Sequence, residues 1–276
     1  MSTAVPGNVA SECSLSLVDD CLQSYLSVSP IGHALFRASE VMPMLVSERT
    51  LARPVMDAGC GRGEGARCLL NAPLDIGVDC DEVGLAACRL NGSHSECKLG
   101  NLCALPLADS IMSSVVCISV LEHLENPEAA IREMHRVLRP GGVLVLTVMV
   151  SGFYELSLVR RILQGLRQHA LARLYLACLD RLFAHHTMRP ATFWEATLED
   201  AGFTVENSVP SVPVHIVSMW EMLLPLSLPF WLCRRSSSVV VPRPRILRTA
   251  LKKVLQVIGK VSPNQTGACQ CLIARR

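Results

Sequence analysis

The chain has 276 residues and a formal net charge of +2, and hydrophobic residues fill 50% of its positions while charged residues fill 18%. This length accommodates one domain with additions around a substantial core. The small net charge gives no support to a nucleic-acid partner, which favours a strongly basic surface. The N-terminus lacks the basic and then apolar layout of a secretory signal peptide.

The 13 cysteines contain no Cys-x-x-Cys pair. Their spacing therefore predicts neither a disulfide framework nor a zinc site, and we expect no metal. We interpret them as buried, reduced thiols that pack as small apolar side chains. Such thiols are typical of a reducing compartment, so the cysteines favour a cytoplasmic protein.

Residues 1–50 are expected to form an N-terminal helical cap. Apolar residues recur at helical spacing between Cys21 and Glu48, around a break at Ser29-Pro30. We expect these helices to lie over a ligand cleft. The alternative is that they only cover an edge of the sheet.

Residues 51–150 alternate between apolar strands and helices. Strands are expected near 53–58, 74–79, 96–99, 115–119 and 143–149, and helices near 63–71, 83–90 and 127–138. This alternation predicts an α/β fold with a mostly parallel sheet and helices on both faces. Asn126 is expected to cap the last of these helices, with Pro127 in its first turn.

The first of these strands runs into Asp57 and then into glycines at positions 59, 61, 63 and 65. A sharp turn from strand to helix requires glycine, and the helix N-terminus beyond it presents free N–H groups. The segment Gly61–Ala66 also matches the dinucleotide fingerprint. Asp79 ends the second strand, 79 − 57 = 22 residues later, where a carboxylate can accept hydrogen bonds from ribose hydroxyls. The pattern predicts a nucleotide-like ligand.

Residues 151–190 are expected to form a helical lid with a break at Gly165. Thr192–Glu195 then has the Thr-x-x-Glu pattern of a capping box, and Gly202 is expected to end the helix that it starts. Two further strands, Phe203–Val209 and Ala268–Ala274, place segments 191–210 and 266–276 in the remainder of the sheet.

Residues 211–265 are expected to form an apolar and basic insertion between the last two strands. Ile216–Cys233 is strongly apolar, but its uncharged run is shorter than the roughly 20 residues that span a bilayer. Ile246–Ile258 has an apolar and a basic face. Two interpretations remain open, an apolar lid over a pocket and a contact with an anionic membrane surface. Both favour an apolar ligand.

Two more motifs complete a recognisable series, Val120–Leu124 after the fourth strand and the Leu-Arg-Pro-Gly-Gly turn at 138–142. Together with the glycine loop and Asp79, in this order, they resemble the class I S-adenosylmethionine (SAM)-dependent methyltransferases, in particular the small-molecule, type 11-like group. The resemblance covers residues 54–150 most closely and 189–206 less closely. It implies a Rossmann-like, mostly parallel seven-stranded sheet with an antiparallel last strand, to which the helical lid and the apolar insertion are added.

The resemblance also implies SAM as the cofactor. The glycines at 59, 61 and 63 are expected to line its methionine part, with Asp57 holding the amine. Asp79 is expected to hold the ribose, and Asn101 stands where the family often has an acid for the adenine amine; Asn keeps the acceptor oxygen but not the charge. The candidate cofactor contacts are Asp57, Gly59, Gly61, Gly63, Asp79, Cys80, Asn101, Leu102 and Ser119.

Methyl transfer from a sulfonium requires mainly alignment of the acceptor and exclusion of water, and a hydroxyl acceptor also gains from a general base. The candidate bases are His123, His185 and His186. A structural role is the alternative for each: packing of His123 within its turn, and interaction of the paired histidines with a helix dipole.

The sequence therefore predicts a SAM-dependent methyltransferase that acts on a small, apolar or lipid-linked acceptor, with O-methylation favoured. The alternatives are an RNA-modifying methyltransferase, a non-catalytic SAM-binding subunit and an NAD(P) enzyme. The protein is expected in the cytoplasm, at the membrane periphery if the insertion binds lipid. No oligomeric state is predicted.

Overall fold

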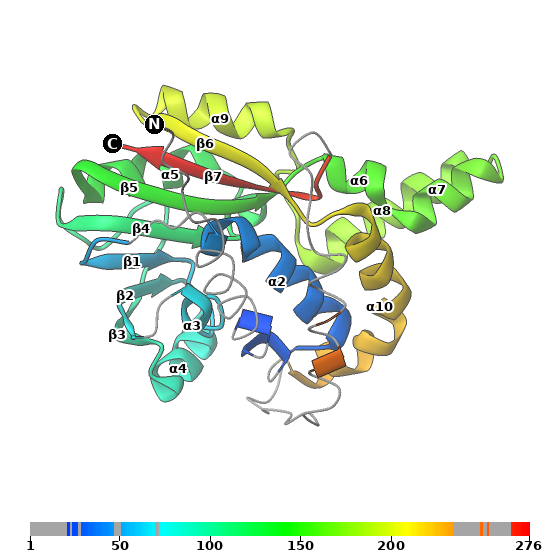
Figure 1. The fold of residues 1–276 in the computed structure, drawn as a ribbon, viewed down its shortest axis with the longest axis horizontal. Coiled ribbons are helices and arrows are strands. Elements are labelled where there is room, and N and C mark those ends of the chain that lie inside the picture. Colours follow the sequence, from blue (N-terminus) through cyan, green and yellow to red (C-terminus); the bar gives the residue numbers. More distant parts are fainter. Residues whose placement is uncertain are drawn as a thin grey trace, which may run out of the picture.

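A seven-stranded sheet of order β3-β2-β1-β4-β5-β7-β6 forms the centre of the computed structural model (Figure 1). The structure describes residues 21–22, 24–26, 29–46, 51–69, 72–234, 249–250, 253 and 266–276. The strands are β1 (Val55–Ala58), β2 (Leu74–Asp79), β3 (His94–Leu99), β4 (Met112–Ile118), β5 (Leu138–Met149), β6 (Thr204–Ser211) and β7 (Cys269–Arg275). Strands β1 to β5 pair in parallel, while β7 is antiparallel to both β5 and β6. The predicted fold class is confirmed.

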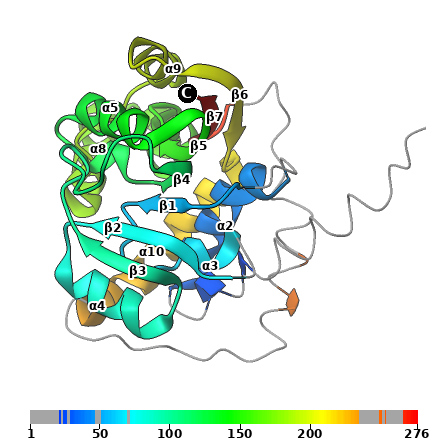
Figure 2. The same ribbon diagram turned by 90° about the vertical axis from the view of Figure 1, so that its left-hand side faces the viewer.

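Helices cover both faces of this sheet, as Figure 2 shows. They are α2 (Ile31–Val46), α3 (Ala66–Leu69), α4 (Glu82–Asn91), α5 (Pro127–Val137), α6 (Gly152–Leu156), α7 (Leu158–Gly165), α8 (His169–Phe183), α9 (Ala191–Asp200) and α10 (Val214–Arg234), with a 3-10 turn η1 (Leu121–His123). Helices α5 and α9 pack on one face, and α2 packs on the other.

Strand β1 contributes side chains to the apolar clusters on both faces of the sheet. Successive strand residues point to opposite faces. Met56 is fully buried in the same cluster as Ile131 of α5 and Trp194 of α9, whereas the preceding Val55 is fully buried in the cluster that contains Leu35 of α2. Both faces of a central strand are therefore apolar, which explains its continuous hydrophobic run.

The ends of two helices test the capping predictions. Asn126 Oδ1 accepts the Ala129 N–H of α5 at 3.0 Å, so the predicted cap is confirmed. The predicted capping box at Thr192 is wrong. Helix α9 begins at Ala191 after an extended Pro190, without a side-chain cap, so Thr192 already lies inside its first turn. The Glu195 carboxylate instead accepts a hydrogen bond from Ser208 Oγ at 2.5 Å.

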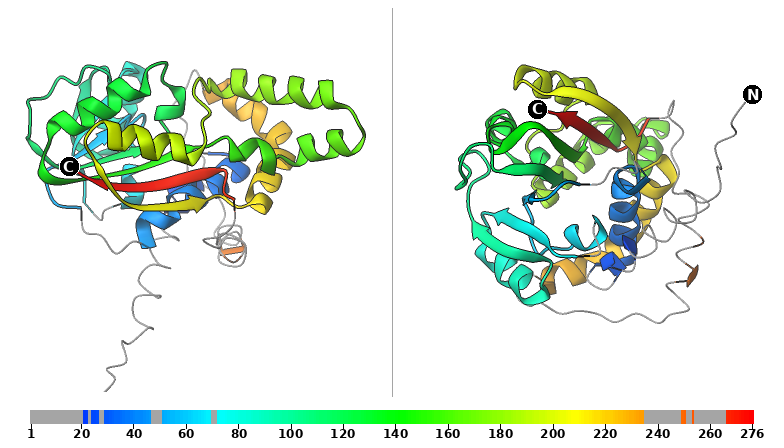
Figure 3. Two further views of the ribbon diagram at one scale, coloured as in Figure 1. Left: turned by 90° about the horizontal axis from the view of Figure 1, so that it is seen from above. Right: turned by 60° about the vertical axis from the view of Figure 1, so that its left-hand side comes forward.

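The segment after β5 forms three helices. Helices α7 and α8 pack against each other and project away from the sheet as a hairpin (Figure 3). Ser157 separates α6 from α7, and its Oγ accepts the Arg160 N–H at 3.1 Å. The buried Glu221 of α10 accepts hydrogen bonds from Ser157 Oγ at 2.6 Å and from the Leu158 N–H at 2.5 Å. The lone acid in the apolar insertion therefore caps the start of α7.

Helix α10 makes up most of the described part of the insertion at 211–265. It lies alongside α2 at one end of the sheet (Figure 1). No helix among the described residues has both the length and the apolar character to cross a bilayer. The side chains of Phe230 and Trp231, and most of the predicted amphipathic segment Ile246–Ile258, lie outside the described residues.

Candidate active site

A cavity of about 500 Å³ lies at the C-terminal ends of β1, β4 and β5. Parallel α/β sheets bind their ligands at this edge. The walls come from segments far apart in the sequence: the loop after β1, helices α2, α6, α8 and α10, and the turn η1. Helix α2, which lies in the predicted N-terminal cap, contributes His33, Phe36 and Arg37 to the lining of the cavity.

The loop after β1 requires glycine at two of its turns. Gly59 and Gly63 have φ of +80° and +75°, a region that residues with a Cβ avoid. A Cβ on Gly59 would overlap the side chain of Val120, and a Cβ on Gly63 would overlap Ser93 Oγ. The loop is thereby held close to the strand ends, and Gly61 between them lines the cavity.

Asp79 ties this loop to the end of β2. Its carboxylate accepts the Gly61 N–H at 2.7 Å and the Asp81 N–H at 2.8 Å. Each oxygen keeps a lone pair for a ligand. Cys80 is exposed, Asn101 Oδ1 accepts the Cys103 N–H at 2.9 Å, and the Leu102 side chain is buried.

The predicted cofactor contacts fall into two groups. Asp57, Gly59, Gly61 and Ser119 line the cavity itself. Gly63, Asp79, Cys80, Asn101 and Leu102 do not line it. Most of this second group follow β2 and β3 at the same edge of the sheet. Their order matches an elongated ligand that extends from the cavity across the ends of β1, β2 and β3.

Asp57 is a buried acid in the cavity wall. Burial raises the pKa of its carboxyl group, and a hydrogen bond from His94 opposes this rise. The distance between Asp57 Oδ2 and His94 Nε2 is 3.0 Å. Sequence reasoning did not include His94, since a histidine at the start of an edge strand carries no motif.

A second buried acid, Glu40 of α2, lies beneath the cavity. Its Oε2 binds Arg37 at 2.6 Å, and its Oε1 accepts hydrogen bonds from Ser119 and Thr147, each at 2.5 Å. Ser119 has a φ of +49°, and these contacts hold it in that conformation. Sequence analysis did not predict this network, because its only trace in the sequence is an Arg-x-x-Glu pair within an apolar helix.

Glu122 is the third buried acid and lines the cavity. Its Oε1 accepts the Met149 N–H at 3.3 Å, whereas its Oε2 has no hydrogen-bond partner within the part of the chain that the structure describes. Burial raises the pKa of this carboxyl group. An unpaired buried acceptor of this kind suits a cationic ligand group.

Two of the three predicted histidines meet in the cavity. The rings of His123 and His185 stack with 5.4 Å between their centroids, and both line the cavity. His123 Nδ1 donates to the Ala184 carbonyl at 3.0 Å, and His185 Nδ1 donates to Asp180 Oδ1 at 3.2 Å. Since both Nδ1 atoms carry the proton, both Nε2 atoms keep a free lone pair. Burial lowers the pKa of His185, although Asp180 opposes this. His186 is exposed and does not line the cavity.

Part of the cavity wall is apolar. It is formed by Phe36, Met149, Phe153, Phe183 and Trp220. The ring centroids of Phe36, Phe153 and Phe183 lie 5.3–5.8 Å from that of Trp220. Trp220 belongs to the predicted insertion, so α10 contributes to the pocket wall.

The geometry agrees with the comparisons to known proteins. Residues 56–146, which contain the glycine loop, Asp79 and β4, match the methyltransferase domain family. This chain carries a class I SAM-dependent methyltransferase domain. A probable SAM-dependent methyltransferase of Mycolicibacterium smegmatis is 39% identical over 113 residues, which cover 41% of this chain and 44% of that protein. The chain thus spans less than half the length of this relative.

More distant relatives share the methyltransferase domain. The ubiquinone biosynthesis O-methyltransferase of Pseudomonas paraeruginosa is 29% identical over 103 residues, covering 35% of this chain and 44% of that enzyme. A crystal structure of a SAM-dependent methyltransferase from Thermotoga maritima, described as a possible histamine N-methyltransferase, superposes with a TM-score of 0.56 at 16% identity. It covers 96% of this chain and 98% of that one. This likeness shows the fold.

SAM, the cofactor of this family, fits the residues of the site. It carries a sulfonium and an ammonium group, and the cavity presents the buried carboxyl groups of Asp57 and Glu122. Backbone that approaches a ligand closely needs glycine, as found at Gly59 and Gly61. Asp79 and Asn101 provide further acceptor oxygens along the sheet edge.

Proposed function

We propose that the protein transfers the methyl group of SAM to a hydroxyl oxygen of a small, largely apolar acceptor. One observation carries the proposal. A single cavity joins a glycine- and carboxyl-lined end to an aromatic end, and two imidazoles with free Nε2 atoms line the same cavity. The first end suits the cofactor and the second suits the acceptor.

The cofactor end would be held by side chains and backbone of the methyltransferase domain. When bound, SAM supplies a methyl group already activated by its sulfonium. Asp57 would bind the amine, Asp79 would accept hydrogen bonds from the ribose hydroxyls, and Asn101 and Leu102 would lie by the adenine. The glycine loop, fixed by Asp79 through the Gly61 N–H, sets where the reactive end of the cofactor lies.

The acceptor end aligns the nucleophile and takes its proton. The aromatic wall around Trp220 excludes water and orients an apolar molecule by shape. His185 is the best-placed general base, because burial keeps its ring neutral and Asp180 fixes the Nδ1–H tautomer. His123, stacked on it, presents a second free Nε2.

Two further points support an apolar, lipid-linked acceptor. One relative of this domain is a ubiquinone biosynthesis O-methyltransferase. Its name describes methyl transfer to oxygen in the synthesis of a lipid-like molecule. The cavity of about 500 Å³ also falls in the usual range of small-molecule sites. A long lipid tail would extend out of such a volume, with only its reactive head enclosed.

The test is methyl transfer into a cell extract of the source organism. Purified protein is incubated with the extract and SAM labelled in its methyl group, and label is counted separately in organic and aqueous phases. We expect label in the organic phase, present as a methyl ether of the acceptor, and its loss with Asp79→Ala. Label confined to the aqueous phase would overturn the apolar acceptor, and label on nitrogen would overturn the hydroxyl.

A further inference from the structure

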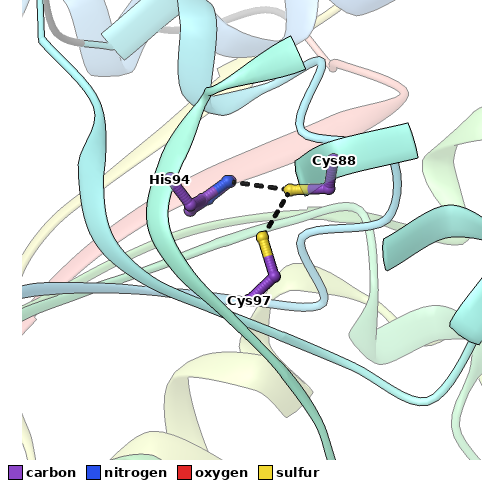
Figure 4. Close-up of side chains that lie close together, drawn as sticks. All are labelled: Cys88, His94 and Cys97. Atoms are coloured by element: carbon purple, nitrogen blue, oxygen red, sulfur yellow. Dashed lines mark hydrogen bonds between the residues drawn. The ribbon is translucent and has the colours of Figure 1, made fainter. Parts of the chain in front are cut away.

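A cluster of sulfur and nitrogen atoms lies beside the methyltransferase site and takes no part in the proposed reaction. Cys88 comes from α4, and His94 and Cys97 come from the adjacent strand β3 (Figure 4). Cys88 Sγ lies 3.0 Å from His94 Nδ1 and 3.2 Å from Cys97 Sγ. The three ligand atoms all lie within 4.8 Å of one another.

The spacing of these atoms suits a single small cation. In a tetrahedral zinc site with bonds of about 2.0–2.3 Å, neighbouring ligand atoms lie roughly 3.4–3.8 Å apart. Cys88 Sγ therefore needs to move away from each of the other two atoms by well under 1 Å to share a zinc ion with them, a shift that small side-chain rotations allow. Two thiolates and an imidazole are soft and borderline ligands, which select zinc over magnesium or calcium.

The imidazole of His94 is already oriented for a metal. Its Nε2 lies 3.0 Å from Asp57 Oδ2, and the two side chains are 0% and 5% exposed. A carboxylate on one ring nitrogen fixes the Nε2–H tautomer, so Nδ1 directs its lone pair at the sulfur atoms. Such a carboxylate–histidine pair is the usual support of a histidine that binds zinc.

A candidate fourth ligand lies in the glycine loop. The buried Cys60 packs in one cluster with Cys88, but its sulfur is not among the ligand atoms that all lie within 4.8 Å of one another, so it would have to move toward the ion. Ser93 Oγ, 3.5 Å from Cys88 Sγ, is a poorer ligand, because neutral hydroxyls bind zinc weakly compared with thiolates. Three cysteines and one histidine make a closed structural site without a position for substrate.

We propose that Cys88, His94 and Cys97, with Cys60 as the fourth ligand, bind one structural zinc ion. The ion would cross-link α4, β3 and the glycine loop on the side of the sheet that carries Asp57. The spacing of the cysteines predicts no metal, since no Cys-x-x-Cys pair is present. It is the fold that brings α4 and β3 together.

The first test measures metal in the intact protein. The chain is purified under reducing conditions without chelator, and its zinc is measured by mass spectrometry. We expect about one zinc per chain, and cobalt(II) in the stripped protein should give the visible bands and the sulfur-to-metal charge-transfer band of a tetrahedral thiolate site. Metal far below one equivalent after incubation with zinc, or a cobalt spectrum without sulfur ligation, would overturn the proposal.

Variants then assign the ligands. Cys88→Ser and Cys97→Ser should each lose most of the bound zinc, whereas Cys178→Ser, an exposed position on α8, should keep it. Asp57→Asn should weaken zinc affinity about 10–100-fold, the usual effect of losing the carboxylate behind a ligating histidine. Unchanged zinc in both ligand variants, or a Cys88–Cys97 disulfide in the purified protein, would overturn the site. Metal content is measured without methyl transfer, so either proposal can fail alone.

Discussion

The imidazole rings of His123 and His185 stack at an interplanar angle of 29°, although one follows β4 and the other follows α8. Each ring is anchored through Nδ1 by an oxygen atom, so each Nε2 keeps its lone pair. An anchored base loses little freedom when it takes a proton, which is what a general base requires. The turn η1 and the end of the helical lid therefore jointly define the reactive part of the cavity.

Replacement of His185 tests this role. His185→Asn should lower kcat about 10²–10⁴-fold with little change in the KM for SAM, because a base acts on the acceptor proton. Asp180→Asn should lower kcat less. Burial lowers the pKa of His185, so the acidic limb of the wild-type pH–rate profile should lie below the ordinary histidine range and disappear in the variant. The exposed His186→Asn is the control, and equal kcat in all four proteins would exclude His185.

Gly63 tests whether the cofactor loop tolerates a side chain. Gly63→Ala adds both the left-handed backbone cost, about 1–2 kcal/mol, and an overlap with Ser93, so unfolding should occur at clearly lower urea and SAM binding should weaken. Gly92→Ala is the matched control, with φ of +64° and no atom within 4 Å of the added Cβ. Equal destabilisation of both variants would show that the overlap relaxes without cost.

Asp79 tests the placement of the ribose. Asp79→Ala should weaken SAM binding by about 1.5–3 kcal/mol for each charge-assisted hydrogen bond lost, as measured by calorimetry. Asp79→Asn keeps an oxygen for the Gly61 N–H and should bind SAM with intermediate affinity. If the Ala variant binds SAM as the wild type does, the ribose does not lie at β2.

Glu122 should make folding stability depend on pH. Burial raises the pKa of its carboxyl group in the folded protein, so the folded state holds its proton more tightly than the unfolded state does. This contribution to stability is fully present below the unfolded pKa of about 4.3 and is lost as pH rises through the folded pKa. Glu122→Gln should flatten this decline in urea unfolding from about pH 4 upward, whereas the exposed Glu199→Gln serves as the matched control. A wild-type slope in Glu122→Gln would assign the decline to another group.

The fold could be predicted from the sequence where the local apolar pattern and the motifs indicated the same element. Asn126 caps α5 as predicted because capping depends only on neighbouring residues. The observed starts of two strands differ from the predicted ones, because pairing with a neighbouring strand determines where these strands begin. Strand β5 begins at Leu138, and β3 begins at His94, because adjacent strands extend the ladder into segments whose sequence suggests a turn.

The parts of the site that sequence did not reveal come from contacts between distant segments. Glu40 meets Ser119 and Thr147 only after α2 has packed on the sheet. Cys88 and Cys97 face each other because α4 packs against β3. Neither arrangement has a fixed spacing along the chain, so only the folded molecule brings these side chains together.

The position of β7 also determines the order in which the chain can fold during synthesis. Among the strands of the described residues, β6 pairs only with β7, yet β7 starts 269 − 211 = 58 residues after β6 ends. At about 5–20 residues per second, β6 must wait on the order of 3–12 s before its partner exists. Over that interval the exposed edge of β5 and the strand β6 lack the partner that later joins them. A chaperone that binds nascent chains would therefore meet β6 and the unpaired edge of β5 in the interval between synthesis of residue 211 and synthesis of residue 269.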